Sequence, residues 1–279
     1  MMKIAITGGK GGTGKSMIAT ALAYKLSKHL RVLLVDLDTE CPNDHLILGI
    51  EQRKIDDVHQ MVPIFDNEKC TRSGKCKDAC TSHAIVQIQG GYPKFFEKLC
   101  NGCGACTIAC KNISKGKKKI GEIHKGMMGG LTVISGYMDI GHAESAMIVT
   151  ATKKHAHKSE DNYDLIIFDT AAGTHCNVVR SLMNTDTAFA VTEPTPLGEH
   201  DLDLILKVTS GLGIKTEIII NRSTIAGTEN IIRLSKRSGS KVVAQVPYSE
   251  SICKAYCNGK PVQDKSIDLL AEKIKRMLR

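Results

Sequence analysis

The chain has 279 residues, a formal net charge of +9 and a hydrophobic fraction of 42%, which together allow one sizeable buried core and a small second domain. It contains no apolar run near the roughly 18 residues that a membrane-spanning helix needs. Its first residues read directly as a strand, so we expect a cytoplasmic protein without a signal peptide. Because the cytosol keeps thiols reduced, the eleven cysteines are expected to serve something other than disulfides.

The positive charge and the cysteines fall in the same part of the chain. Residues 67–119 hold eleven Lys and Arg against three Asp and Glu, a net charge of +8, and seven of the eleven cysteines lie between Cys70 and Cys110. Few aromatic residues accompany the basic ones, which argues against nucleic acid as the partner. Clustered cysteines indicate a metal site, and the surrounding positive charge favours an acidic protein partner.

Near the start, a glycine-rich loop connects an apolar strand at 4–6 to a helix with apolar spacing at 17–23. Its sequence GGKGGTGKS, residues 8–16, contains the pattern G-x-x-x-x-G-K-[ST] in the strand–loop–helix context that this phosphate-binding motif requires. Glycine lets backbone N–H groups turn inward around an anion. Lys15 is expected to reach the β- and γ-phosphates, and Ser16 is expected to hold Mg²⁺. The nucleotide-binding residues predicted in this loop are Gly9, Gly11, Gly12, Thr13, Gly14, Lys15 and Ser16.

Further apolar segments predict a parallel sheet. Residues 31–36 form a second strand that leads into the pair Asp36 and Asp38, and residues 163–169 form another that ends in Asp169. A carboxylate at the carboxyl end of a strand is placed to orient the water shell of Mg²⁺. Later strands are expected at 131–135, 187–191, 216–220 and 241–246, with helices at 146–156 and 201–210. This alternation predicts an α/β fold with a doubly wound, mostly parallel sheet.

Two segments interrupt this pattern. Residues 42–64 are interpreted as a helix and a loop broken at Pro63, and residues 115–126, which contain three glycines, as a loose basic connector. We therefore predict a sheet domain formed by residues 1–65 and 116–279, with residues 66–115 as an inserted small α+β domain. The last helix, 266–278, followed by Arg279, carries one apolar face. Packing on the sheet is the simpler interpretation of this face, and binding to a membrane surface is the alternative.

The cysteine spacing matches that of bacterial two-cluster ferredoxins. Two segments follow the pattern C-x₂-C-x₂-C-x₃-C, one over 70–80 with Ser73 at its second position and one over 100–110 with all four cysteines. The fourth cysteine of each run in this pattern ligates the other cluster. The complete set for one 4Fe-4S cluster is therefore Cys80, Cys100, Cys103 and Cys106. The remaining set, for a labile 4Fe-4S or a 3Fe-4S cluster, is Cys70, Cys76 and Cys110.

Zinc is the alternative metal, although two offset ferredoxin patterns fit it poorly. Four cysteines lie outside the two patterns, and a lone cysteine is usually a small buried hydrophobic residue. That interpretation is adopted, with no role assigned, for Cys41, Cys176, Cys253 and Cys257.

Together these motifs resemble the MinD/ParA/nitrogenase iron protein class of P-loop ATPases, in its MinD-like branch, with an inserted two-cluster ferredoxin domain. The segments that carry the resemblance are GGKGGTGKS, LVDLD, DTAAGTHC, VTEPTP, IIINR and VPY. It implies ATP hydrolysis in a dimer, with Lys10 supplied to the nucleotide of the facing subunit. It also implies that Asp38 orients the attacking water and Asp169 holds the Mg²⁺ shell. The catalytic residues would be Lys10, Lys15, Asp38 and Asp169, and the adenine site would be formed by Asn221, Arg222, Pro247 and Tyr248.

The preferred hypothesis is an ATPase that couples Mg·ATP binding and hydrolysis to electron transfer, or to iron–sulfur cluster or metal assembly on a partner. Two alternatives stay open. One is a redox protein in which ATP is a docking switch with negligible turnover, and the other is a MinD-like positioning or scaffold ATPase with structural clusters. The expected dimer is formed by two identical chains or with a paralogue. No nucleic acid or membrane partner is expected.

Overall fold

The structure is a computed structural model and describes residues 1–142 and 145–278; Arg279, expected after the last helix, lies outside them. The chain divides into two compact units. The first comprises residues 1–56, 122–137 and the described part of 145–279, and the second comprises residues 57–121 and the described part of 138–144. The boundaries fall inside β3 (Arg53–Phe65) and near the middle of β6 (Ile113–Met128).

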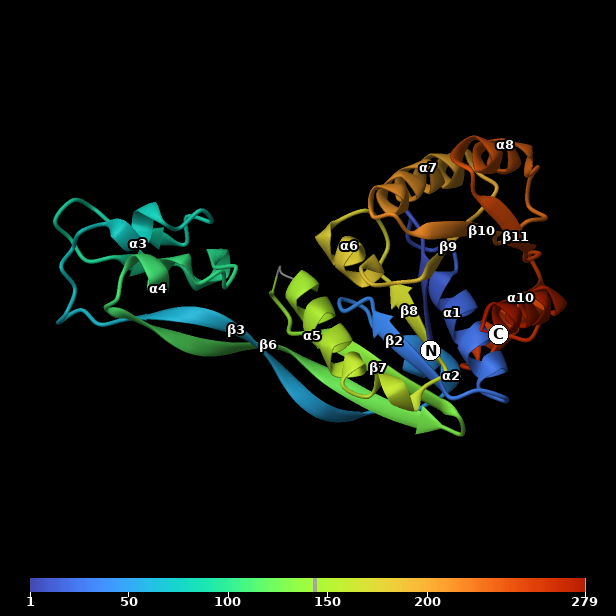
Figure 1. Ribbon diagram of the computed structural model, residues 1–279, viewed down its shortest axis with the longest axis horizontal. Helices are drawn as coiled ribbons and strands as arrows, with labels where there is room; N and C mark the ends of the chain where they lie inside the picture. Colours follow the sequence, from blue (N-terminus) through green and yellow to red (C-terminus); the bar gives the residue numbers. More distant parts are fainter. Residues whose placement is uncertain (143–144, 279) are drawn as a thin grey trace. The chain divides into compact units, whose positions relative to one another are not determined.

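A nine-stranded sheet has the order β11-β10-β9-β1-β8-β2-β7-β6-β3 (Figure 1). The pairings from β11 to β7 are all parallel. This confirms the predicted α/β fold with a mostly parallel sheet, and the predicted strands and helices lie within a few residues of the observed ones. The seven parallel strands are β11 (Lys241–Gln245), β10 (Lys215–Ile220), β9 (Thr187–Thr192), β1 (Met2–Thr7), β8 (Leu165–Thr170), β2 (Val32–Leu37) and β7 (Leu131–Met138).

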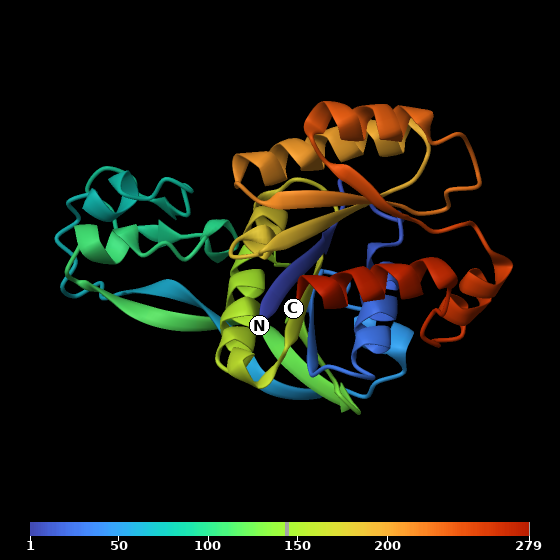
Figure 2. The same ribbon diagram turned by 45° about the vertical axis from the view of Figure 1, so that its right-hand side comes forward.

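Helices cover both faces of this sheet. All six residues of β2, β8 and β9 are buried, which is typical of parallel strands with helices on either side. Ile4 and Ile6 pack with α1 (Lys15–Leu26) and α10 (Lys265–Met277), whereas Phe168, facing the other way, contacts Lys153 of α5 (Ser145–His157). Figure 2 shows α10 (red) lying across α1 (blue) on one side of the sheet. The remaining helices are α2 (Asp44–Leu48), α6 (Cys176–Leu182), α7 (Pro196–Gly211), α8 (Glu229–Ser238), α9 (Glu250–Cys257) and the 3₁₀ helix η2 (Glu160–Asn162).

The apolar face of the last helix is part of this core. Ile267, Leu270 and Ile274 of α10 are at most 1% exposed, and they pack in the same cluster as α1. The interpretation that this helix packs on its own sheet is confirmed. Across residues 1–142 and 145–278, every helix is too short or too polar to cross a bilayer.

Two expectations about the chain between these strands are wrong. Residues 53–65 and 113–128 are the strands β3 and β6, neighbours at the sheet edge, rather than a loop and a basic connector. The glycines of the supposed connector allow close approach: a Cβ on Gly116 would lie 2.9 Å from Ile64, and one on Gly126 would lie 2.5 Å from the Glu51 carbonyl oxygen. Pro63 is compatible with β3 because β3 is an edge strand, one side of which forms no ladder hydrogen bonds.

The second unit contains both cysteine segments, and they have the same local fold. Its elements are α3 (Lys75–Asp78), α4 (Ala105–Ala109), the antiparallel pair β4 (Ile85–Val86) and β5 (Lys94–Phe95), and the 3₁₀ helix η1 (Glu97–Leu99). Each α-helix follows a glycine in the left-handed region, with φ of 77° at Gly74 and 79° at Gly104. A small core holds Cys76 and Cys106, one from each helix, against Ile85 and Ile113.

Candidate functional site

The phosphate loop joins β1 to α1, and neighbouring residues leave no room for a Cβ at two of its glycines. A Cβ on Gly9 would lie 2.2 Å from the carbonyl oxygen of Asp201. Gly14 has φ of +92°, and a Cβ there would lie 2.3 Å from Asn221 Nδ2. That Asn221 amide instead donates to the Thr13 carbonyl oxygen at 2.8 Å. The loop is therefore held in one conformation at the N-terminus of α1, where backbone N–H groups and the helix dipole favour an anion.

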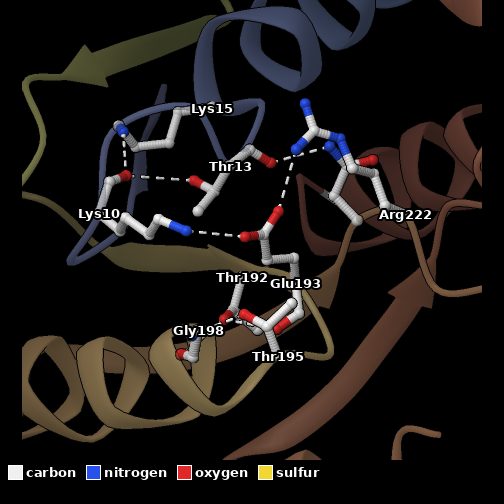
Figure 3. A network of polar contacts seen from close by, with 9 residues as sticks. Lys10, Thr13, Lys15, Thr192, Glu193, Thr195, Gly198 and Arg222 are labelled. Atoms are coloured by element: carbon white, nitrogen blue, oxygen red, sulfur yellow. Dashed lines mark hydrogen bonds and ion pairs between the residues drawn. The ribbon is translucent and has the colours of Figure 1, made fainter. Parts of the chain in front are cut away.

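Lys15 points into the turn of this loop. Its Nζ donates to the Lys10 carbonyl oxygen at 3.0 Å, and the residue is 7% exposed (Figure 3). Burial lowers the pKa of Lys15, and the nearby carboxylates of Asp169 and Asp38 oppose that effect. A buried cation whose main bond goes to a single carbonyl has donors left for phosphate oxygens.

Three buried carboxylates lie below the loop. Oxygens of Asp36, Asp44 and Asp169 lie within 4.8 Å of one another, and all three residues are at most 1% exposed. Both oxygens of Asp44 and of Asp169 lack a hydrogen-bond partner among the described residues. Burial raises the pKa of Asp36 and Asp44 well above the ordinary range, and that of Asp169 to about 7. Orphaned carboxylate oxygens beside a phosphate loop are the donors that Mg²⁺ prefers, so these residues fit the expected ion.

A cavity of about 400 Å³ opens beside the loop and brings together residues far apart in the sequence. Its lining includes most of the predicted nucleotide site: Gly11, Gly12, Gly14, Lys15, Ser16, Asp38, Asn221, Arg222, Pro247 and Tyr248. Asp38 is partly buried, and burial raises its pKa while Lys15 opposes that shift. A larger groove of about 750 Å³ lies where β10 and β11 begin, at Lys215 and Lys241. Parallel α/β sheets bind ligands at the carboxyl ends of their strands, so we assign the nucleotide to the smaller cavity.

The predicted residues outside this lining lie close to it. Thr13 is 1% exposed and acts through its backbone, accepting from Asn221, while its hydroxyl donates to the Lys10 carbonyl oxygen at 3.4 Å. Asp169 belongs to the buried carboxylates described above. Lys10 points elsewhere, because its Nζ forms an ion pair with Glu193 Oε1 at 2.9 Å (Figure 3).

Glu193 links Lys10 to Arg222, which lines the cavity. Its second oxygen, Oε2, pairs with Arg222 Nη1 at 3.0 Å, and its side chain is 8% exposed. Burial alone would raise the pKa of Glu193, but the contacts with Lys10 and Arg222 hold that pKa below its ordinary value. The carboxylate is therefore charged and shared between two cations.

The nucleotide cavity also contains two cysteines. Cys253 and Cys257 of α9 line it beside Tyr256, and Cys257 is exposed, as are Cys41 and Cys176. The interpretation of these cysteines as small buried side chains is therefore wrong for three of the four, and Cys253 is partly buried. Their place at the cavity depends on α9 folding back toward the loop, which a local pattern does not report.

Sequence reasoning also missed Asp44 and Glu193. Asp44 lies in the segment interpreted as a helix and a loop, and nothing in its neighbours marks it as the partner of carboxylates on β2 and β8. Glu193 stands in the VTEPTP segment, one of the segments that carry the resemblance. An acidic residue directly after a buried strand is the signal that could have identified it, as it identified Asp169.

In the second unit, the cysteines gather into two sets. One small cavity is lined by the last cysteine of the first run and the first three of the second run: Cys80, Cys100, Cys103 and Cys106. Cys70 and Cys110 lie near Cys76: burial raises the pKa of the Cys76 thiol, and both neighbours raise it further. The fourth cysteine of each run thus lies with the opposite run, as the ferredoxin spacing predicts.

The fold and the loop define a P-loop nucleotide-binding domain, and comparison with known proteins identifies the family. The family model of the CobQ/CobB/MinD/ParA nucleotide binding domain matches residues 4–262. The chain belongs to this family of nucleotide-binding proteins and is an ATPase.

Relatives in sequence and structure support this assignment. The uncharacterized protein MJ0579 of Methanocaldococcus jannaschii is 36% identical over 262 residues, covering 93% of this chain and 90% of that protein. MJ0578 of the same organism is 30% identical over 286 residues, covering 100% and 98%. Among solved structures, the Pyrococcus furiosus cell division ATPase MinD has a TM-score of 0.61 at 20% identity, covering 99% of both chains. The Pyrococcus horikoshii septum site-determining protein MinD, complexed with Mg-ADP, has a TM-score of 0.62 at 20% identity, covering 99% and 96%.

These relatives bear on the three functional hypotheses. They support nucleotide binding and a MinD-like ATPase, and they contain no indication of electron transfer or of cluster assembly. The hypothesis of a MinD-like ATPase therefore fits them better than the hypothesis of a redox-coupled enzyme.

Proposed function

We propose that the chain is a MinD-like ATPase that closes as a dimer around Mg·ATP and carries iron–sulfur clusters in its cysteine-rich segment. The observation that supports a dimer is that the two lysines of the phosphate loop have different surroundings. Lys15 lines the nucleotide cavity, whereas the Lys10 side chain is one-third exposed and pairs with Glu193. A lysine presented at the surface is available to a nucleotide bound in a facing subunit.

The remaining residues of the site take complementary roles in this proposal. Lys15 and the backbone of the loop bind the phosphates, and Ser16 with Asp169 would hold Mg²⁺, which neutralises phosphate charge. Asp38 orients the attacking water. Asn221 and Arg222 recognise adenine together with Pro247 and Tyr248, the latter being 58% exposed and free to cover a base.

For the cysteine-rich segment, we propose an inserted ferredoxin-like domain over residues 66–115, between the two parts of the ATPase domain, 1–65 and 116–279. Supporting this are the matched folds of the two cysteine runs and the crossing of their fourth cysteines. Four thiolates suit a 4Fe-4S cluster. The set of Cys70, Cys76 and Cys110 has Ser73 at its missing position, which is exposed, so this site would hold a labile 4Fe-4S or a 3Fe-4S cluster.

The partner is proposed to be an acidic protein, since residues 67–119 carry a net charge of +8. A similar chain from Aquifex aeolicus is found in a MinC:MinD cell division protein complex, so a protein partner is consistent with this fold. The dimer itself is formed by two copies of the chain or by the chain with a paralogue.

A second candidate function is electron transfer or cluster assembly coupled to the nucleotide. One observation favours it: Cys103, a ligand of the complete set, is exposed, which would place a cluster within reach of a redox partner. A cluster spectrum or reduction potential that shifts on adding a nonhydrolysable ATP analogue would support coupling, whereas unchanged clusters would support the structural role.

The ATPase proposal is tested with three lysine variants. Lys15→Ala is expected to lose Mg·ATP binding, because it removes the cation inside the cavity. Lys10→Ala is expected to bind ATP but to lose ATP-dependent dimerisation and hydrolysis, measured by light scattering and phosphate release. Lys25→Ala is the matched control, since Lys25 is similarly exposed and pairs with Asp268 at 2.7 Å. Unchanged turnover in Lys10→Ala would refute the shared site.

The cluster proposal is tested on protein purified without oxygen. Iron and sulfide are counted and the reduced clusters are examined by electron paramagnetic resonance. Ser73→Cys is expected to complete the second set and to add one iron per chain, while Ser114→Cys, which is exposed and outside both patterns, should add none. Zinc in place of iron, or two ordinary 4Fe-4S clusters in the wild type, would contradict this part of the proposal.

A further inference from the structure

The ion pair between Lys10 and Glu193 joins residues 183 positions apart. Glu193 directly follows β9 and is nearly buried, while the Lys10 side chain is 33% exposed. Neither oxygen of the carboxylate is left unpaired, since Oε1 receives Lys10 and Oε2 receives Arg222 (Figure 3). This one carboxylate therefore contacts a residue of the phosphate loop and a residue of the nucleotide cavity.

The backbone around Glu193 is fixed from both sides. Thr192 accepts the backbone N–H of Asn221 at 2.7 Å, and its hydroxyl donates to the Gly198 carbonyl oxygen at 2.8 Å. Thr195 caps α7 by accepting from Gly198 N at 3.0 Å. Gly198 approaches so closely that a Cβ there would lie 2.2 Å from the Glu193 carbonyl oxygen. Glu193 is thus presented at a set position, and Lys10 is the long flexible side chain that adapts to it.

We propose that Glu193 is a positioning residue that retains Lys10 on its own subunit until a second subunit closes around ATP. This inference rests on the proposed function, in which Lys10 acts across the dimer. To reach the facing nucleotide, the Lys10 amine must leave Glu193. A buried carboxylate that lost its only partner would be strongly disfavoured, but Arg222 remains on Oε2, so the charge stays paired when Lys10 departs.

Arg222 connects this retention to the nucleotide. It lines the cavity, and its φ of 50° lies in the left-handed region, where a residue with a side chain stays only if its surroundings hold it. One of those surroundings is Glu193. A nucleotide seated against Arg222 therefore acts on the same carboxylate that holds Lys10.

The first test measures Lys10 directly, without nucleotide and without a dimer. Reductive methylation followed by peptide mass spectrometry gives the labelling rate of each lysine, with buried Lys15 as the internal reference. Glu193→Gln keeps the shape of the side chain and removes its charge, and it is expected to raise the Lys10 rate by roughly threefold to tenfold. Glu217→Gln is the matched control, since Glu217 is equally buried and pairs with Lys273 at 2.8 Å. An unchanged Lys10 rate in Glu193→Gln would overturn the proposal.

The second test measures dimerisation with a nonhydrolysable ATP analogue. Glu193→Gln is expected to lower the analogue concentration needed for half-maximal dimer, because Lys10 no longer has to be released. If labelling rises but this concentration stays at the wild-type value while Lys10→Ala fails to hydrolyse ATP, the shared site stands and the retention is refuted. If Lys10→Ala dimerises and hydrolyses ATP normally, the proposed function fails, and the retention fails with it.

If Glu193→Gln does not fold, a second variant, Glu193→Asp, provides the same test. Glu193→Asp keeps the charge but is one methylene shorter, so it cannot span both cations at their observed distances. It is expected to change Lys10 labelling and dimerisation in the same direction as Glu193→Gln, and wild-type values in a folded Glu193→Asp protein would also count against the proposal.

Discussion

Replacing Asp169 by asparagine should make the stability of the nucleotide-free protein less dependent on pH. Asp169 is 1% exposed, both its oxygens lack hydrogen-bond partners among residues 1–142 and 145–278, and it lies against Asp36 and Asp44. Burial raises its pKa from 3.8 to about 7. At about 1.4 kcal/mol per unit, this shift corresponds to up to about 4 kcal/mol of stability linked to one proton.

The sign of the effect follows from which state holds the proton more tightly. The folded protein binds the Asp169 proton more tightly than the unfolded chain, so this stabilisation is fully present below about pH 4 and is lost as the pH rises to about 7. Asp169→Asn has no proton to lose. The free energy of unfolding of the variant, relative to that of the wild type, should therefore increase by up to about 4 kcal/mol over this range.

The measurement is urea unfolding followed by circular dichroism, in EDTA and without nucleotide, at several pH values from 4.5 to 8. Asp161→Asn removes an exposed carboxylate and serves as the control. Adding Mg·ADP should flatten the pH dependence of the wild type, because a cation stabilises the charged carboxylates. Parallel curves for the wild type and Asp169→Asn in EDTA would refute the account of Asp169 as a buried carboxylate without a hydrogen-bond partner.

Three further predictions concern other features of the ATPase unit. Gly14→Ala places a Cβ at φ +92° against the Asn221 amide, so calorimetry should show weaker Mg·ATP binding, and the free energy of unfolding should fall by about 1–3 kcal/mol. Cys253 and Cys257 line the nucleotide cavity, so saturating Mg·ADP should slow their alkylation by maleimide; equal rates would place the nucleotide elsewhere. Lys153→Ala leaves three backbone carbonyls that now accept from its Nζ without that donor. It should cost roughly 2–4 kcal/mol in urea unfolding, and unchanged stability would contradict this.

The sheet could be predicted where burial is continuous along a strand. Strands such as 32–37 and 165–170 are apolar over their whole length because both faces are covered, and that pattern is local to the sequence. Strands β3 and β6 escaped prediction because they are half-exposed and contain lysines, glycines and a proline. What makes them strands is their pairing with each other at the sheet edge, which is a long-range property.

The residues of the candidate site also fall into those that the local sequence predicts and those that it does not. The phosphate loop is contiguous, so its residues could be identified from spacing alone. The carboxylate cluster and the Glu193 contacts join segments that are distant in the chain, and only the parallel order of β2, β8, β1 and β9 brings them together. The cysteine sets join distant segments, but their spacing still predicts that the fourth cysteine of each run lies with the other run. The position of Cys80 beside the second run agrees with this prediction.

Lys10 and Lys15 show why the loop sequence alone gives an incomplete account of the site. They are five residues apart and chemically identical, and Lys15 even donates to the Lys10 carbonyl. Their side chains nevertheless have different surroundings, since Lys15 is buried beside carboxylates and Lys10 is held by a glutamate from the far half of the chain. The loop determines that a phosphate binds. Glu193 determines the position of the Lys10 side chain in the nucleotide-free protein. Dimerisation around ATP therefore has to break the ion pair between Lys10 and Glu193.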